Sequence, residues 1–215
     1  MKKFFSALIV LAVISSAVVA ETKSAFSINA SIPLDTLTVK QEVSIFSDST
    51  KATSASFGFG ISGLTFFNDL IGIYSSADVA FLFNVQNDNG SFSREEVYGS
   101  GAKQYSLNVM VGPVFKIIDK NNMLFTAAPA VHMYSNTVKS GSTTSTGALI
   151  GLGGNASFSY FFNDLIGITA GVDLAYDFIG LGDYKKQTFD YSGYDYTIKF
   201  SNFQFAPKFG VTFKF

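Results

Sequence analysis

The stretch Phe66-Phe67-Asn68-Asp69-Leu70-Ile71-Gly72-Ile73 occurs a second time, 95 residues later, as Phe161-Phe162-Asn163-Asp164-Leu165-Ile166-Gly167-Ile168. In both copies an aromatic pair leads into a polar Asn-Asp corner, and a segment that alternates large apolar with small or polar residues follows it. Asn and Asp tolerate turn dihedral angles, and alternation with period two is typical of a strand. The repeat therefore predicts the same β-hairpin twice, as one supersecondary unit used two times.

The same alternation predicts eight strands in all. They are expected at residues 26–32, 57–67, 71–83, 105–117, 123–133, 150–162, 166–178 and 203–215. The spacing of the repeat supports this number, because it assigns four strands to each half of the chain. Longer connections are expected at 34–52, with some strand extension, and at 84–104, 135–146 and 180–199. Short turns are expected at 68–70, 119–122 and 163–165.

The first twenty residues have the pattern of a signal peptide. Lys2 and Lys3 precede an apolar segment, and a run of small residues ends at Ala20. We therefore expect cleavage near Ala20, with residues 1–20 as the signal peptide and 21–215 as one domain. The alternative is a membrane anchor helix, but the apolar segment is shorter than the roughly 20 residues that a spanning helix needs.

Composition narrows the class of the exported domain. Charged residues make up 14% of the chain, against roughly 25% in a soluble domain. The chain has 24 phenylalanines, 19 glycines and no cysteine, so disulfides and a lipid anchor on cysteine are excluded. The net charge of −1 argues against binding of nucleic acid. Either a soluble β protein or a membrane β-barrel remains.

Three observations favour the membrane barrel. The polar face of the strands consists mainly of Gly, Ser, Ala and Asn, which suit a crowded lumen better than a surface in water. Short and long connections alternate, as in barrels that have short periplasmic turns and long extracellular loops. Aromatic residues gather at strand ends, as interfacial girdles do. The expected girdle residues are Phe66, Phe67, Phe161, Phe162, Phe213 and Phe215 at one end and Phe81, Phe83, Tyr176 and Phe178 at the other.

The sequence thus predicts an all-β fold, an eight-stranded antiparallel up-and-down transmembrane β-barrel. A signal peptide, eight amphipathic strands and a terminal phenylalanine resemble the small outer-membrane barrels, the class of the OmpA membrane domain, OmpX and the OmpW group. The resemblance implies the outer membrane of a diderm bacterium. It also implies that the barrel-assembly machinery reads Phe209, Val211, Phe213 and Phe215. A soluble, lipocalin-like barrel is the alternative fold.

Three prolines lie inside expected strands, where each removes a hydrogen-bond donor. Pro113 and Pro129 are expected opposite each other across a short turn, and Pro207 lies in the last strand. Local bulges would accommodate them, and the alternative is that one of these strands is broken.

Asp78 and Asp173 occupy the same position in the two repeats, both on the small-residue face. Asp173 is expected across from Asn155 and near Lys208, and Lys116 is also expected to line the lumen. These residues either form a polar lining for solute passage or fill the lumen with ion pairs, because buried charges need partners.

His132 is the one histidine, and it is expected to face the lumen. The segment 132–136 resembles the His-x-Ser-Asn motif of outer-membrane lipid A deacylases. However, His132 and Ser135 are three residues apart and would point to opposite faces of a strand. No glutamate lies near to orient the imidazole. We therefore predict no enzyme, no metal site and no cofactor.

We predict an integral, monomeric outer-membrane protein in contact with outer-membrane lipid. Its expected function is porin-like narrow passage of small or hydrophobic solutes. The alternative is a surface structural protein or adhesin that binds a host ligand through its extracellular loops. Tyrosines in 184–196 suit a recognition surface, although a girdle or a strand extension explains them as well.

Overall fold

The structure is a computed structural model that describes residues 24–43, 46–87, 90–99, 101–191 and 194–215. The predicted signal peptide and its cleavage site lie outside these ranges. Strands make up nearly all of the described chain, and α2 (Arg94–Tyr98) is a helix of five residues. Among the described residues, no helix is long and apolar enough to span a membrane.

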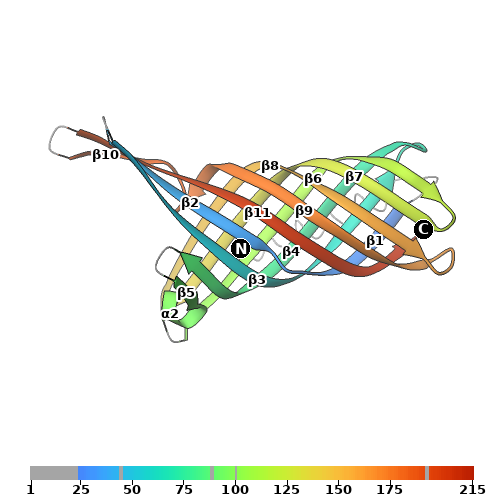
Figure 1. The fold of residues 1–215 in the computed structure, drawn as a ribbon, viewed down its shortest axis with the longest axis horizontal. Helices are drawn as coiled ribbons and strands as arrows, with labels where there is room; N and C mark the ends of the chain where they lie inside the picture. Colours follow the sequence, from blue (N-terminus) through green and yellow to red (C-terminus); the bar gives the residue numbers. More distant parts are fainter. Residues whose placement is uncertain (1–23, 44–45, 88–89, 100, 192–193) are drawn as a thin grey trace.

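The strands form one tilted antiparallel sheet that curls into a barrel (Figure 1). Their bounds are β1 (Ser24–Ser31), β2 (Leu34–Val43), β3 (Phe46–Phe66), β4 (Ile71–Asn87), β5 (Gly90–Ser93), β6 (Lys103–Lys120), β7 (Met123–Ser140), β8 (Thr143–Phe161), β9 (Ile166–Gly182), β10 (Gln187–Tyr191) and β11 (Tyr194–Lys214).

The barrel wall consists of eight strands, because β1 and β2 are two parts of one strand. Both pair with β3 on one side and with β11 on the other. The remaining wall strands follow in chain order as β3, β4, β6, β7, β8, β9 and β11, and each pairs with the next. The pairing of β11 with β1 and β2 closes the ring. The predicted eight-stranded up-and-down barrel is confirmed.

Pro33 causes the break between β1 and β2. It has no backbone N–H, so the regular ladder stops there. Two hydrogen bonds hold the wall together at this point: Ile32 N donates to Pro207 O at 3.1 Å, and Ser56 N donates to Pro33 O at 3.0 Å. The register is the same before and after the break. Pro33 and Pro207 are thus accommodated without opening the barrel.

Pro113 and Pro129 lie opposite each other, as predicted. Val111 pairs with Val131 and Phe115 with Ala127, and regular pairing is interrupted between these two pairs. The backbones come very close here, because a Cβ atom on Gly112 would lie 2.0 Å from the carbonyl oxygen of Pro129. Glycine at position 112 therefore keeps β6 and β7 together where the prolines remove donors.

The two copies of the repeated stretch form the same turn. Asn68 Oδ1 accepts hydrogen bonds from the backbone N–H of Leu70 and Ile71, both at 2.8 Å. Asn163 Oδ1 accepts from Leu165 and Ile166 at 2.9 and 2.8 Å. The asparagine side chain thus replaces backbone partners within each turn. Together with the Asn121–Asn122 turn between β6 and β7, these corners form the turn end of the barrel.

The connections at the other end are mostly strands rather than loops, which corrects the sequence prediction. The segments expected as loops contain β2, β5, β10, α2 and the outer parts of β3, β4, β7, β8, β9 and β11. Both faces of a strand meet water beyond the lipid, so the alternation that reveals a strand disappears there. We call residues 37–43 of β2, residues 46–52 of β3, β10 and residues 194–201 of β11 the extension; its strands pair in the order β3, β2, β11, β10.

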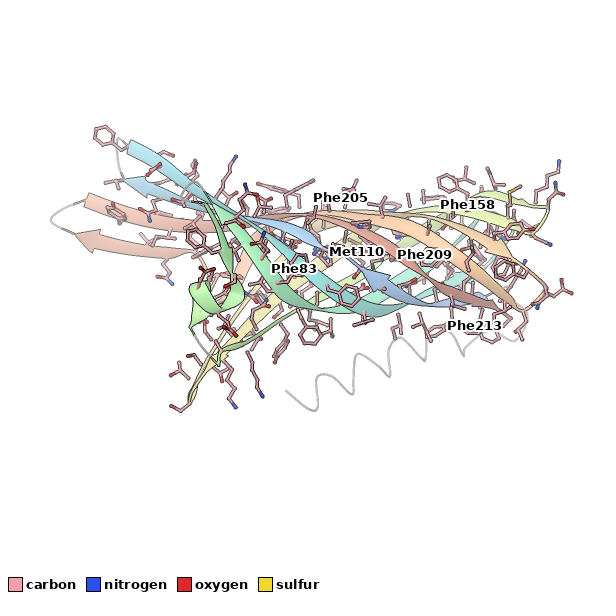
Figure 2. All side chains as sticks on the ribbon, turned by 60° about the horizontal axis from the view of Figure 1, so that its bottom comes forward. Phe83, Met110, Phe158, Phe205, Phe209 and Phe213 are labelled. Atoms are coloured by element: carbon pink, nitrogen blue, oxygen red, sulfur yellow. The ribbon has the colours of Figure 1, made fainter. Side chains whose placement is uncertain are left out.

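Large apolar side chains cover the outside of the wall, and polar and small ones face the lumen. Phe158, Phe205 and Phe209 lie on the outer surface, whereas Met110 is buried inside (Figure 2). The predicted orientation of the two strand faces is confirmed. The predicted girdle at the turn end is wrong for Phe66 and Phe161, which are 4% and 3% exposed and face inward. In each Phe-Phe pair the first ring faces the lumen and the second faces outward, because neighbouring residues in a strand point to opposite faces.

Candidate functional site

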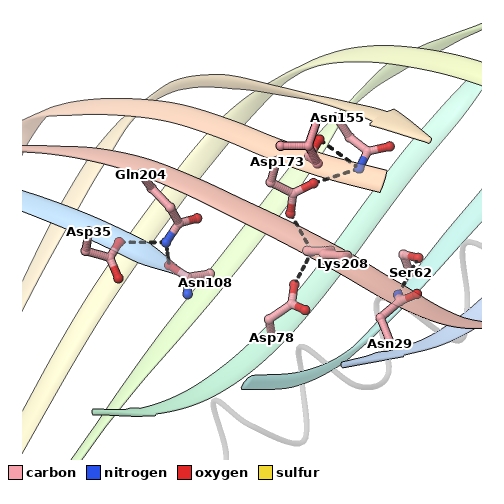
Figure 3. A network of polar contacts seen from close by, with 10 residues as sticks. Asn29, Asp35, Ser62, Asp78, Asn108, Asn155, Asp173, Gln204 and Lys208 are labelled. Atoms are coloured by element: carbon pink, nitrogen blue, oxygen red, sulfur yellow. Dashed lines mark hydrogen bonds and ion pairs between the residues drawn. The ribbon is translucent and has the colours of Figure 1, made fainter. Parts of the chain in front are cut away.

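The centre of the lumen holds an ion-pair cluster built by four strands. Lys208 Nζ on β11 lies 2.6 Å from Asp78 Oδ2 on β4, and it also contacts the carboxylate of Asp173 on β9. Asn155 Nδ2 on β8 donates to Asp173 Oδ1 at 2.7 Å (Figure 3). The predicted positions of Asp173 opposite Asn155 and near Lys208 are confirmed. The repeat therefore places its two equivalent aspartates on one lysine.

The cluster crosses the lumen, and its two carboxylates share the single ammonium group of Lys208. Lys208, Asp78, Asp173 and Asn155 are all buried. Gly60 is the direct partner of Asp78 on β3, and a Cβ atom there would lie 2.2 Å from Asp78 Oδ1. Glycine at position 60 thus provides the space into which the Asp78 carboxylate projects.

Lys116, predicted in the same lumen, lies apart from this cluster. Its Nζ donates to Asp119 Oδ2 at 2.9 Å and sits 4.4 Å from the centre of the Phe66 ring. It is buried near the turn end, where Lys214 lies in a similar way over Phe161. Lys116 therefore closes the lower end of the lumen instead of joining the central ion pairs.

Between these two levels the lumen holds large apolar side chains together with buried polar ones, such as Ser76, Thr126 and Thr169. Large buried side chains from several wall strands form one cluster there. Its larger members are Leu64, Phe66, Tyr74, Met110, Val114, Leu124 and Phe161. We call this cluster, which occupies much of the lower lumen, the apolar plug.

A second polar network lies above the ion pairs, and the sequence did not predict it. Gln204 Nε2 donates to Asp35 Oδ1 at 2.8 Å and to Asn108 Oδ1 at 2.9 Å, so it links β11 with β2 and β6 across the lumen (Figure 3). Asn202 Nδ2 also donates to Asp35 Oδ1, at 3.3 Å. Asp35 was missed because it lies in a segment that was expected to be a connection.

His132 faces the lumen as predicted, but it has an acidic partner. Its Nδ1 lies 2.9 Å from Asp177 Oδ1 and 3.0 Å from Oδ2, and both side chains are fully buried. The sequence does not reveal Asp177 as the partner of His132, because strand pairing brings together residues 45 positions apart. We call Asp35, Asn108, His132, Asp177, Asn202 and Gln204 the upper polar ring.

The extension carries a separate ion-pair cluster in water. Glu42 on β2 accepts hydrogen bonds from Lys40 Nζ at 2.8 Å and from Lys199 Nζ on β11 at 2.6 Å. These hydrogen bonds lower the pKa of Glu42 to about 2, and the bond from Lys199 has the largest effect. The pair of Glu42 and Lys199 therefore ties β2 to β11 beyond the barrel wall.

The residues of the predicted assembly signal lie on the outside of β11, at its C-terminal end. Phe209, Val211 and Phe215 are exposed, and Phe213 is partly exposed. The terminal residue is tied into the wall, because Phe215 N donates to Ser24 O at 2.8 Å. Among the described residues, no group of three or more His, Asp or Glu side chains could hold a metal ion.

No family model and no curated protein matches this sequence. Solved structures do resemble the barrel. Outer membrane protein OprG from Pseudomonas aeruginosa superposes with a TM-score of 0.60 at 14% identity, over 90% of this chain and 96% of that one. Neisserial surface protein A gives 0.46 at 16% identity over 89% and 99% of the chains. Ail, the attachment invasion locus protein of Yersinia pestis, gives 0.44 at 15% over 91% and 99%. The likeness to OprG shows the fold of a small outer-membrane β-barrel.

Proposed function

We propose that this protein is a monomeric anchor in the outer membrane that presents a folded β extension at the cell surface, where it acts as a structural or adhesive protein. The observation that carries the proposal is the contrast between a lumen crossed by central ion pairs above the apolar plug and wall strands that continue far beyond the lipid. Outer-membrane lipid surrounds the barrel, and its terminal aromatic pattern serves assembly.

The filled lumen argues against a pore as the main function. Lys208 joins Asp78 and Asp173 across the centre, and the apolar plug lies below it. Moving an ion past this region requires the ion pairs to separate and the plug to open, and a buried charge without its partner is costly. An eight-stranded barrel is only wide enough for its own side chains or one small ligand.

The length of the strands supports a role at the surface. β3 has 21 residues, whereas a tilted strand crosses a membrane with about 9–11. The outer part of β3 pairs with β2 on one side, but β4 joins its other side only from Thr53 onward. Residues 46–52 therefore offer a strand edge without a partner among the described residues. Such an edge can bind an extended segment of another protein.

Shortening the extension tests this function. Because Val39 pairs with Thr50, replacing residues 40–49 by Asn-Gly should join the two strands in a tight turn. We expect the shortened protein to fold but to lose attachment of expressing cells to surfaces coated with collagen, fibronectin or laminin. The matched control replaces residues 139–144 by Asn-Gly, because Val138 pairs with Ser145 in the β7–β8 hairpin.

Attachment that is equal in the intact and the shortened protein, or absent from both on all three coatings, would contradict the adhesive function. Folding is checked separately by the change in gel migration between heated and unheated samples. The control should attach as well as the intact protein.

Passage of a small solute, the function named first from the sequence, is the second candidate. The observation in its favour is the polar character of the upper lumen, with its buried amides and carboxylates. Recording current across planar bilayers distinguishes the two candidates. We expect no conductance steps from the intact protein. Reproducible steps that persist in the shortened protein would support passage instead.

A further inference from the structure

The upper mouth of the lumen is covered by one tyrosine. Tyr184 lies in the turn between β9 and β10, and its ring packs on the bare backbone of Gly147. A Cβ atom on Gly147 would lie 2.6 Å from that ring. The ring also stacks on Phe200 of β11, with 5.2 Å between centroids. Tyr184 therefore bridges β8 and β11 over the mouth.

Hydrogen bonds continue this cover to the opposite wall. Asn136 Nδ2 donates to Tyr184 Oη at 3.3 Å, and Gln104 Nε2 donates to Asn136 Oδ1 at 2.6 Å. Gln104 Oε1 in turn accepts from the backbone N–H of Leu82 on β4 at 2.9 Å. The turn that carries Tyr184 begins at Gly182, whose φ of 60° suits glycine. Tyr184 therefore covers the mouth from the β9–β10 turn, and the hydrogen bond from Asn136 holds its side chain in place.

The upper polar ring lies below this cover, with the buried side chains of Tyr134 and Ser106 between them along β7 and β6. Asn136 and His132 are four residues apart on β7, as are Gln104 and Asn108 on β6. Asp177 pairs in register with Asn202, so the His132 pair and the Asp35 network adjoin each other. Below the ring lie the central ion pairs and the apolar plug. The ring is therefore closed from below by the ion pairs and the apolar plug, and from above by Tyr134 and Tyr184.

The ring contains buried polar atoms that lack a hydrogen-bond partner among the described residues. These are His132 Nε2, Asn202 Oδ1 and Asn108 Nδ2. His132 Nδ1 faces the carboxylate, and in the neutral tautomer with its proton on Nδ1 the Nε2 atom is an acceptor. Asn202 Nδ2 faces Asp35, so its free Oδ1 is also an acceptor. Buried polar atoms without a protein partner are costly, so water molecules or a bound guest are expected to meet them.

The charges of the ring point to the same kind of guest. Asp177 is paired with His132, whereas the partners of Asp35 Oδ1 are the amides of Gln204 and Asn202. Two carboxylates and one imidazole give the ring a negative balance. A guest that fits must therefore bring positive charge together with several N–H donors.

We propose that the upper polar ring is a closed-ended binding site for a small organic cation with N–H donors, a primary ammonium or a guanidinium. Asp35 pairs with its charge, and His132 Nε2 and Asn202 Oδ1 accept its hydrogen bonds. The guest enters from outside the cell when the turn at 182–184 moves the Tyr184 ring off Gly147. This site is independent of the adhesive function, which concerns the extension.

Titration of the full-length protein in detergent micelles tests the site. The probes are methylguanidinium and methylammonium chloride, read out by the side-chain amide NMR signals of Asn108 and Asn202. We expect saturable shifts from both probes and none from tetramethylammonium, which has the charge but no N–H donor. Asp35→Asn should weaken binding about tenfold or more, because a hydrogen-bonded charge is lost. Asp48→Asn, on the exposed part of β3, should leave binding unchanged.

The cover has its own test in the same titration. Tyr184→Ala should speed exchange of the bound probe without removing binding, and Tyr184→Phe should exchange more slowly than Tyr184→Ala. Shifts that rise linearly without saturation, an equal response to tetramethylammonium, or unchanged affinity in Asp35→Asn would overturn the proposal and leave a ring filled by water. If Asp35→Asn does not fold, the titration of the intact protein still tests the site. Shifts centred on Glu42 or Asp48 instead of Asn108 and Asn202 would place binding on the surface and contradict the proposal.

Discussion

His132 Nδ1 lies 2.9 Å from Asp177 Oδ1, although β8 stands between their strands. His132 pairs in register with Gly151, and Gly151 pairs with Asp177. The absence of a side chain on the middle strand lets the imidazole reach over it. One glycine therefore determines whether the upper lumen contains a hydrogen-bonded pair or two separate buried polar groups.

Removing His132 and Asp177 together should cost less than the two single losses added. His132→Ala leaves the buried Asp177 carboxylate without its partner, and we expect a loss of about 3–5 kcal/mol in the free energy of unfolding. The double variant His132→Ala/Asp177→Ala should lose less than the sum of the single variants. Urea unfolding in micelles, followed by circular dichroism, measures both. Additive losses would mean that the two side chains are not coupled in the folded protein.

Gly151 should not tolerate even a methyl group. A Cβ atom there would lie 1.9 Å from the carbonyl oxygen of Tyr176, so the strands must move apart. We expect Gly151→Ala to lose about 1–3 kcal/mol of unfolding free energy. The matched control is Gly63→Ala, where the nearest atom would be Ser75 Oγ at an ordinary 3.5 Å. Equal stability of the two variants would show that the wall adapts at Gly151.

Lys208 should be the most sensitive charged residue of the lumen. Lys208→Met removes the cation between Asp78 and Asp173 and leaves two buried carboxylates facing each other. We expect a loss of about 3–5 kcal/mol at neutral pH, or failure to fold. Lys103→Met on the exposed end of β6 serves as control and should change little. If Lys208→Met is as stable as the control, water compensates for the missing ammonium group.

The sequence predicts the barrel well because lipid and lumen impose opposite demands on the two faces of a strand. Phe209 and Lys208 show this directly, since one faces lipid and the next faces the ion pairs. The repeat adds long-range information, and it correctly places Asp78 and Asp173 at equivalent sites. Asn155 and Lys208 follow from counting residues from the turns.

What the sequence does not reveal depends on contacts across the ring or on strands in water. Asp35 contacts Gln204 only because the barrel closes. His132 contacts Asp177 only because Gly151, which pairs with both, has no side chain between them. The extension escapes prediction for a different reason, because the alternation is incomplete across its strands and residues 47–51 of β3 are polar on both faces. Phe66 was misassigned although its parity in the strand matches the lumen-facing Ser56 and Gly58, because a girdle was assigned to both members of the aromatic pair.

The repeated corners should contribute equally to stability. Asn68→Ala and Asn163→Ala each remove an acceptor of two backbone hydrogen bonds, and we expect each to cost about 1 kcal/mol. The two corners are separate, so the double variant should lose about the sum. Asp69→Ala, at an exposed neighbouring position, should be close to neutral. A much larger loss at one corner would show that the repeats are not equivalent in their packing.

Acid should loosen the extension before it affects the barrel wall. The pKa of Glu42 is about 2 in the folded protein, below the ordinary value of 4.5, because Lys199 and Lys40 donate to its carboxylate. A lowered pKa means that this contribution is fully present above pH 4.5 and is lost as the pH falls from there toward 2. Amide hydrogen exchange in β2 and the paired part of β11 should therefore quicken, beyond the intrinsic effect of pH, between pH 4.5 and 2. Glu42→Gln should remove this dependence, and an identical pH profile in that variant would assign the effect to another group.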